Sequence, residues 1–201
     1  DFEGRVAIVT GAGNGLGRSH ALALADRGAK VVVNDLGGAR DGTGASSDAA
    51  MEVVSMIESA GGEAFAHGAN VANFDEVQDM VSQARAKWGR VDILINNAGI
   101  WRATPITDSY EKVLDDFEAI IATNLRGVFQ VGRSVIPHMV EAGNGEIINI
   151  ATDHIVPPHG FATGGGSRMD IYDASKWGTR GLTESWAKAL KPHNIRVNAL
   201  G

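Results

Sequence analysis

The amino-acid sequence predicts an α/β fold, a doubly wound parallel sheet of Rossmann-like topology in a single domain. Short runs rich in β-branched residues alternate along the chain with longer segments whose apolar residues recur every three or four positions. A glycine-rich turn separates the first such run from the first such segment. Alternation of this kind implies parallel strands joined by right-handed helical crossovers, with helices on both faces of the sheet.

Six runs fit strands and five segments fit helices, because the runs are short and β-branched and the segments have helical periodicity. In chain order, the expected elements are strand 5–10, helix 16–27, strand 30–35, helix 49–60, strand 63–68, helix 75–88, strand 91–96, helix 115–139, strand 145–151, helix 172–190 and strand 195–200. Two loops look inserted, at 37–48 and 153–170. We expect one dinucleotide-binding domain over residues 1–201, with a C-terminal segment not covered.

The composition narrows the classes of partner. The 201 residues are 44% hydrophobic and 21% charged, with a formal net charge of -6 that argues against nucleic acid and favours small molecules. The absence of cysteine excludes disulfides, thiol catalysis and cysteine-ligated metals. No apolar run approaches the roughly 20 residues that cross a membrane, and a strand follows the N-terminus almost at once. A cytoplasmic protein without membrane contact is therefore expected.

The loop TGAGNGLG (10–17) is a candidate pyrophosphate site, since glycines let the backbone approach a ligand at a helix N-terminus. Asp35 ends the second strand, where a carboxylate can bind the ribose hydroxyls of NAD and repel the extra phosphate of NADP. Asn14 and Leu36 add no positive charge there, although Arg40 is a possible cation. NAD is therefore favoured over NADP. A plain turn, and a loop-capping role for Asp35, stay open.

Four motifs in order resemble the short-chain dehydrogenase/reductase family over nearly the whole chain. They are GxxxGxG at Gly11, Gly15 and Gly17, NNAG at 96–99, Asn124 in TNLRG, and YxxxK at Tyr172 and Lys176. The resemblance implies an NAD(P)-dependent oxidoreductase acting on an alcohol or ketone, and a homo-oligomer, tetramer or dimer. Other phrases, such as VVVNDLGG and GRSHALALA, are similar to the (3R)-hydroxyacyl-CoA dehydrogenase-like and carveol-dehydrogenase-like branches.

The resemblance also implies which residues contact the cofactor. They are Gly11, Asn14, Gly15, Leu16, Gly17, Asp35, Leu36, Asn70, Val71, Asn97, Ala98, Gly99, Tyr172 and Lys176. At Asn70 the sequence departs from the family, which usually has Asp before Val.

Tyr172 and Lys176 share a helix face, being four residues apart. We expect the ammonium, with the positive nicotinamide, to lower the pKa of Tyr172 and make the phenol a usable base. The resemblance implies that Lys176 also holds the nicotinamide ribose and that Asn124 supports a water relay. Thr152 stands at the position where the family usually has a serine, and Ser167 is the alternative source of a hydroxyl.

The second inserted loop offers further candidates, because loops at the carboxyl ends of strands line the ligand crevice. These are His154, His159, Phe161, Arg168 and Met169, which either shape the substrate pocket or are solvated. The two histidines lack a third ligand, so no metal is expected. The helices expected at 115–139 and 172–190 either form a subunit interface or pack within one chain. The competing hypotheses are a non-catalytic nucleotide-sensing protein and a structural subunit of a catalytic partner.

Overall fold

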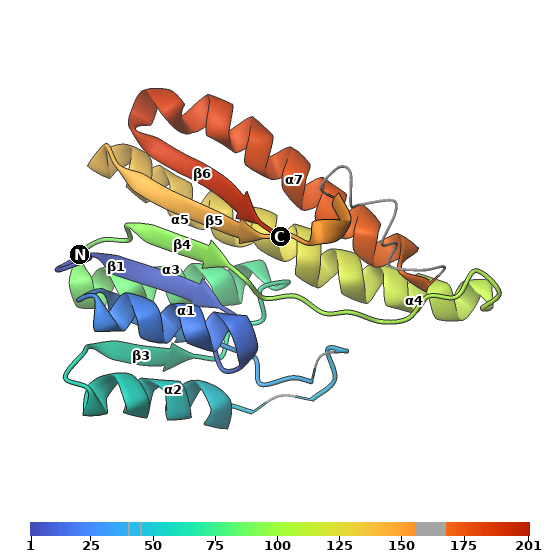
Figure 1. The fold of residues 1–201 in the computed structure, drawn as a ribbon, viewed down its shortest axis with the longest axis horizontal. Helices are drawn as coiled ribbons and strands as arrows, with labels where there is room; N and C mark the ends of the chain where they lie inside the picture. Colours follow the sequence, from blue (N-terminus) through green and yellow to red (C-terminus); the bar gives the residue numbers. More distant parts are fainter. Residues whose placement is uncertain (40, 45, 156–167) are drawn as a thin grey trace.

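The computed structural model describes residues 1–39, 41–44, 46–155 and 168–201 (Figure 1). Six parallel strands form one sheet in the order β3-β2-β1-β4-β5-β6. The strands are β1 (Val6–Thr10), β2 (Lys30–Asn34), β3 (Ala64–His67), β4 (Ile93–Asn96), β5 (Gly145–Ile150) and β6 (Ile195–Leu200). Each lies within its predicted range, and the doubly wound parallel topology is confirmed.

The helices pack on both faces of this sheet (Figure 1). They are α1 (Gly15–Asp26), α2 (Asp48–Ser59), α3 (Phe74–Trp88), α4 (Tyr110–Ile121), α5 (Val128–Ala142) and α7 (Asp170–Leu190). Successive residues of a strand point to opposite faces. Ile8 of β1 therefore packs in the core with α3, α5 and α7, whereas its neighbour Val9 packs in the core with α1 and α2. No helix among the described residues has the length and apolar character needed to cross a membrane.

The prediction of one regular helix over 115–139 is wrong in its start and its continuity. The helical segment begins at Tyr110, where the Ser109 hydroxyl caps the N-terminus by accepting from the Lys112 N–H. A π-helical segment, Ala122–Gly127, then separates α4 from α5. Gly127 fits here because a Cβ at this position would lie 2.7 Å from Cγ2 of Val71. Such local widening of a helix recurs at functional sites.

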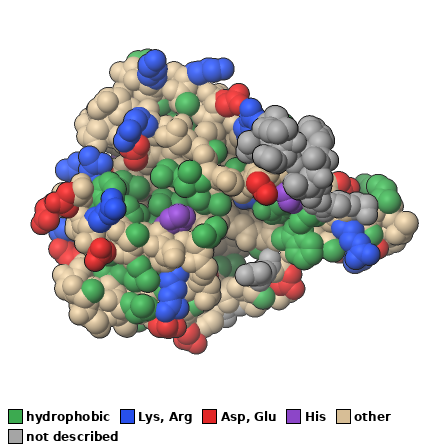
Figure 2. Space-filling view, viewed as in Figure 1, with side chains coloured by type: hydrophobic (Ala, Val, Ile, Leu, Met, Phe, Trp, Pro, Cys, Tyr) green, Lys and Arg blue, Asp and Glu red, His purple; other side chains and the backbone are tan. Residues whose placement is uncertain are grey.

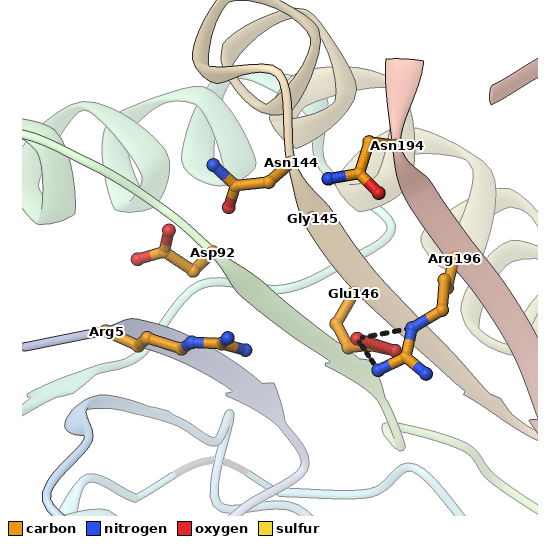
Figure 3. Close-up of a pocket in the computed structure, with 7 residues that line it drawn as sticks. All are labelled: Arg5, Asp92, Asn144, Gly145, Glu146, Asn194 and Arg196. Carbon is orange, nitrogen blue, oxygen red and sulfur yellow. Dashed lines mark hydrogen bonds and ion pairs between the residues drawn. The ribbon is translucent and has the colours of Figure 1, made fainter. Parts of the chain in front are cut away.

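The carboxyl ends of the strands meet at one edge of the sheet, as they must in a parallel sheet. The loops after β1, β2, β4 and β5 therefore converge there, and they carry most of the residues that the sequence singles out. At the opposite edge the amino ends of the strands line a small polar pocket of about 190 Å³ (Figure 3). Its lining residues are Arg5, Asp92, Asn144, Gly145, Glu146, Asn194 and Arg196.

Candidate active site

The loop after β1 has a backbone that only glycine adopts readily. Gly11 and Gly15 have φ of 61° and 54°, in the left-handed region. A Cβ on Gly17 would lie 2.1 Å from the carbonyl oxygen of Gly11, so no other residue fits there. The N-cap of α1, Asn14, makes no side-chain capping bond, and the first turn has no acidic residue. The N–H groups at this helix end are thus available to an anion, and the side chain of Leu16 beside them is 64% exposed.

Asp35 follows β2, and its carboxylate links the loop after β1 to the loop after β2 by hydrogen bonds. Its Oδ2 accepts a hydrogen bond from the Gly13 N–H at 2.7 Å, and its Oδ1 accepts one from the Gly37 N–H at 2.6 Å. Asp35 therefore caps both loops. Each carboxylate oxygen retains further acceptor capacity, so a second role toward ribose hydroxyls is compatible with these contacts. The neighbouring Leu36 is partly exposed.

Hydrogen bonds connect the turn after β4 to the end of β1. The Asn97 amide donates to the carbonyl oxygens of Thr10 and Gly11, at 3.0 and 2.9 Å. In return, the Thr10 hydroxyl accepts from the N–H groups of Asn97 and Ala98, both at 3.0 Å. Asn97 thus holds the NNAG turn against the glycine loop.

Asn70 and Val71 form a turn after β3. The Asn70 side-chain oxygen accepts from the Ala72 N–H at 2.9 Å, and the Val71 carbonyl accepts from the Gln130 amide at 2.8 Å. Val71 is buried. In this turn Asn70 retains its side-chain NH₂ for another partner.

Asn124 lies in the π-helical segment and is fully buried. Its Oδ1 accepts from the Ile100 N–H at 2.8 Å, and its Nδ2 donates to the Ile100 carbonyl at 2.9 Å and to the Ser175 hydroxyl at 3.2 Å. The side chain therefore fixes the segment after the NNAG turn against α7. This scaffold role is visible in the structure.

Lys176 of α7 is an almost completely buried ammonium, 5% exposed. Its Nζ donates to the Ile150 carbonyl at 2.7 Å, and no carboxylate among the described residues forms an ion pair with it. Burial lowers the pKa of Lys176 to about 8. A Cβ on Gly99 would lie 3.7 Å from this Nζ and 3.4 Å from Oδ1 of Asn124, so the NNAG turn, Asn124 and Lys176 meet at one point.

The pKa of Tyr172 is raised, chiefly because burial disfavours the phenolate. The Asp173 and Asp153 carboxylates raise it further, and a hydrogen bond with the Thr152 hydroxyl works against them. Lys176 Nζ lies 5.7 Å from the centre of the phenol ring. For the polypeptide by itself, the pKa of Tyr172 is therefore raised and not lowered, because burial and two carboxylates disfavour the phenolate. The expected lowering included the positive nicotinamide, and for the cofactor-bound protein it stays a prediction.

Thr152 follows β5, and its hydroxyl lies near the Tyr172 phenol. The hydroxyl donates to the Asp153 carboxylate at 3.3 Å. The alternative hydroxyl, Ser167, lies outside the described residues, as do His159 and Phe161. The carbonyl of Arg168 accepts from the Thr104 N–H at 2.9 Å, and Met169 is the N-cap of α7.

The sequence reasoning missed Asp173. Its Oδ1 lies 2.8 Å from Nδ1 of His154, and the imidazole packs edge-on against the Tyr172 ring. Because Asp173 adjoins Tyr172 in the sequence, a charge beside the phenol was foreseeable, but the contact with His154 depends on the tertiary fold.

The chain is similar to a known protein family, to curated relatives and to solved structures. The family model described as short chain dehydrogenase matches residues 5–201. A peroxisomal hydratase-dehydrogenase-epimerase of Saccharomyces cerevisiae is 41% identical over 203 residues, which cover 99% of this chain and 21% of that protein. A 3-oxoacyl-(acyl-carrier-protein) reductase of Thermotoga maritima is 35% identical over 199 residues, covering 99% of this chain and 73% of the relative.

Among solved structures, a 7α-hydroxysteroid dehydrogenase in complex with NADH and 7-oxo glycochenodeoxycholic acid matches with a TM-score of 0.84. It is 33% identical, and the match covers 98% of this chain and 70% of the solved one. The chain thus spans about three quarters of the Thermotoga reductase but only a fifth of the yeast peroxisomal enzyme. The likeness to that enzyme supports the predicted resemblance to the hydroxyacyl-CoA dehydrogenase-like branch.

Proposed function

The chain belongs to the short chain dehydrogenase family, and from that premise we propose that it interconverts a secondary alcohol and a ketone with NAD, using Tyr172 as the general acid and base. One observation carries the proposal. Thr152, Tyr172 and Lys176 come from two separate elements and meet at the sheet edge that also holds the glycine loop. The alternative, a nucleotide-sensing protein without catalysis, accounts for the buried ammonium through ribose binding but gives no reason for a phenol and a second hydroxyl to lie beside it.

The residues present fit a nicotinamide dinucleotide. The uncapped start of α1 suits the pyrophosphate, and the exposed Leu16 offers apolar surface in the same place. Asp35 would accept from ribose hydroxyls, and its charge would repel the extra phosphate of NADP, which favours NAD. Lys176 has further N–H groups beyond the bond to Ile150, and we assign them to the nicotinamide ribose. A bound dinucleotide supplies the hydride acceptor or donor.

Side chains of the polypeptide give and accept the proton that is transferred in the reaction. In ketone reduction, the Tyr172 hydroxyl gives its proton to the carbonyl oxygen, while the Thr152 hydroxyl donates a hydrogen bond to the same oxygen. In alcohol oxidation, Tyr172 accepts the proton, so it must first be ionised. Because burial and two carboxylates raise the pKa of Tyr172, oxidation needs positive charge beside the phenol. Lys176 carries such a charge below about pH 8, and an oxidised nicotinamide ring is the second source.

Asn124 has a supporting part in this proposal. Its buried side chain holds Ile100 and Ser175, which fixes the π-helical segment beside Lys176. The water relay that the resemblance implies would then run from Lys176 past this segment to solvent.

The relatives define which substrates to test first. The Thermotoga reductase makes oxoacyl thioesters the leading class, and the solved hydroxysteroid dehydrogenase makes hydroxysteroids the second. We further propose a homo-oligomer, tetramer or dimer. Figure 2 shows hydrophobic side chains at the end of the molecule where α4 projects beyond the sheet. Large hydrophobic residues exposed by at least 41% on α4, α5 and α7 are Tyr110, Leu114, Phe117, Phe129 and Trp177. A cytoplasmic location stays a prediction, since one relative is named as peroxisomal.

The decisive variant is Tyr172→Phe, which removes only the hydroxyl. Turnover should fall about 10²- to 10⁴-fold, the range for loss of a general acid or base. The matched control is Tyr110→Phe at the exposed start of α4, where turnover should be unchanged. Turnover is measured with NAD and NADP in parallel against oxoacyl thioesters, secondary alcohols and hydroxysteroids. A folded Tyr172→Phe protein that binds NAD and keeps full turnover would overturn the proposal, and NAD binding with no turnover on any substrate would favour the nucleotide-sensing protein.

A further inference from the structure

A second polar pair lies beside Tyr172 and has no part in the reaction described so far. His154 is in the short 3-10 helix Asp153–Ile155 after β5, and Asp173 is in the first turn of α7. Nδ1 of His154 lies 2.8 Å from Oδ1 of Asp173. A carboxylate only accepts hydrogen bonds, so the proton of this bond belongs to Nδ1 of the imidazole.

The imidazole of this pair also contacts the catalytic phenol. The ring centres of His154 and Tyr172 are 6.3 Å apart with an interplanar angle of 75°, an edge-to-face arrangement that aromatic pairs prefer. The side chain of His154 is only 18% exposed, so it is held between Asp173 and Tyr172. The imidazole therefore limits how the phenol ring can rotate.

The charges around the phenol come from both elements packed against it. From the segment after β5 there are Asp153, 72% exposed, and His154. From α7 there are Asp173, 32% exposed, and Lys176. Arg180 is engaged with Glu184 and with the Ile155 carbonyl. Asp170 accepts from the Thr104 hydroxyl.

We propose that His154 and Asp173 are positioning residues for Tyr172: Asp173 orients the imidazole, the imidazole edge holds the phenol ring, and the Nδ1–H screens the Asp173 carboxylate from the phenol oxygen. This inference rests on the proposed role of Tyr172 as acid and base. The pair thus has a packing effect, on ring orientation, and an electrostatic effect, on the ease with which the phenol loses its proton.

The two effects can be separated by substitution. His154→Asn keeps a donor near the position of Nδ1 but removes the ring, so turnover should fall about tenfold or more, as expected when a reacting group is misplaced. The pH midpoint of oxidation should stay in place. His154→Phe keeps the ring but removes the donor. Asp173 is then unscreened, the phenolate is less stable, and the midpoint should move to higher pH.

Asp173→Asn should act in the opposite direction. The amide still accepts from Nδ1–H through its oxygen, but the negative charge beside the phenol is gone. Since the Asp173 carboxylate raises the pKa of Tyr172, its removal should lower that pKa and move the midpoint to lower pH. The shift should be modest, because the Asp173 carboxylate is 32% exposed and partly solvated. The matched control is Glu58→Gln, which removes an exposed carboxylate on α2 and should shift nothing.

A spectroscopic readout makes the test independent of turnover. The chain has two tyrosines, so Tyr172 is the only phenol in a Tyr110→Phe background, and tyrosinate absorbance against pH reports its ionisation directly. Asp173→Asn should lower the midpoint in this background. Unchanged midpoints and turnover in all three variants, with Tyr172→Phe inactive, would overturn this inference alone. An active Tyr172→Phe protein would instead overturn the proposed function beneath it.

Discussion

Buried charges at the two edges of the sheet differ in whether they have a counter-ion. At the amino edge, the carboxylate of Asp92 is 3% exposed and accepts from the Arg90 guanidinium at 2.6 and 2.8 Å and from the Val6 N–H at 2.9 Å. In the same region Arg196 forms an ion pair with Glu146 at 2.8 Å (Figure 3). At the carboxyl edge, Lys176 is buried with a carbonyl as its hydrogen-bond partner, and no ion pair joins it to a carboxylate among the described residues.

This difference separates stability from function. A buried charge whose ion pair and hydrogen bonds are complete is tolerated by the fold, whereas one without a counter-ion destabilises it. The pKa of about 8 for Lys176 is the physical sign of that destabilisation. The amino edge therefore has a structural role. The carboxyl edge keeps a destabilising charge because, on our proposal, the reaction needs it beside Tyr172.

Lys176→Met tests the comparison most strongly, because it should have the largest effect on both turnover and stability. Turnover should fall about 10²-fold or more, because the positive charge that assists the phenol is lost. The free energy of unfolding should rise by about 1–3 kcal/mol at neutral pH, because a buried uncompensated charge is removed. Kinetics and urea unfolding of the same preparation measure both.

The pH dependence of that stability gain has a definite sign. The folded pKa of Lys176, about 8, lies below the unfolded value of ~10.4, so the unfolded chain binds more protons between them. The destabilisation is complete below about pH 8 and disappears as the pH rises to the unfolded pKa. The gain from Lys176→Met should therefore shrink over this window. A Lys176→Met variant that is less stable than wild type at neutral pH would contradict the claim that this buried charge destabilises the fold.

Asp92→Asn tests the opposite edge and should affect stability alone. The amide cannot neutralise Arg90 and has one acceptor oxygen in place of two, so at least one of the three present hydrogen bonds is lost. The free energy of unfolding should fall by about 2–3 kcal/mol, less than for a fully buried pair because Arg90 is half exposed. Turnover at a temperature where the variant stays folded should equal that of wild type. A large loss of turnover in a folded variant would show that the two edges are not independent.

Arg196→Ala should have the smallest effect. The Arg196 side chain is 76% exposed, so its ion pair with Glu146 is screened by solvent. The free energy of unfolding should change by less than about 1 kcal/mol. Repeating the urea titration at high salt should abolish the difference, and an effect as large as that of Asp92→Asn would mean that exposure does not separate these pairs.

Periodicity was enough to predict the parallel sheet, and glycine spacing marked the loop after the first strand as a ligand-binding loop. These features depend on local pattern and on rules of topology. Asn97, Thr152 and Tyr172 became candidates through the resemblance to the family. The π-helical segment around Asn124 could not be predicted, because an extra residue in a helical turn leaves the apolar pattern nearly intact. The direction of the Tyr172 pKa shift in the polypeptide by itself was missed for another reason. The sequence shows the lysine four residues away but not the burial of the phenol, which is the main cause of its raised pKa.

The most direct test of the account is the ionisation of Tyr172 with and without cofactor. Tyrosinate absorbance of the Tyr110→Phe protein is titrated alone and with saturating NAD. Without NAD, the midpoint should lie above ~10, the value of a free phenol, because burial and carboxylates raise the pKa. With NAD, it should fall well below that value. A midpoint that stays above that of a free phenol while NAD is bound would contradict the role of Tyr172 as the base.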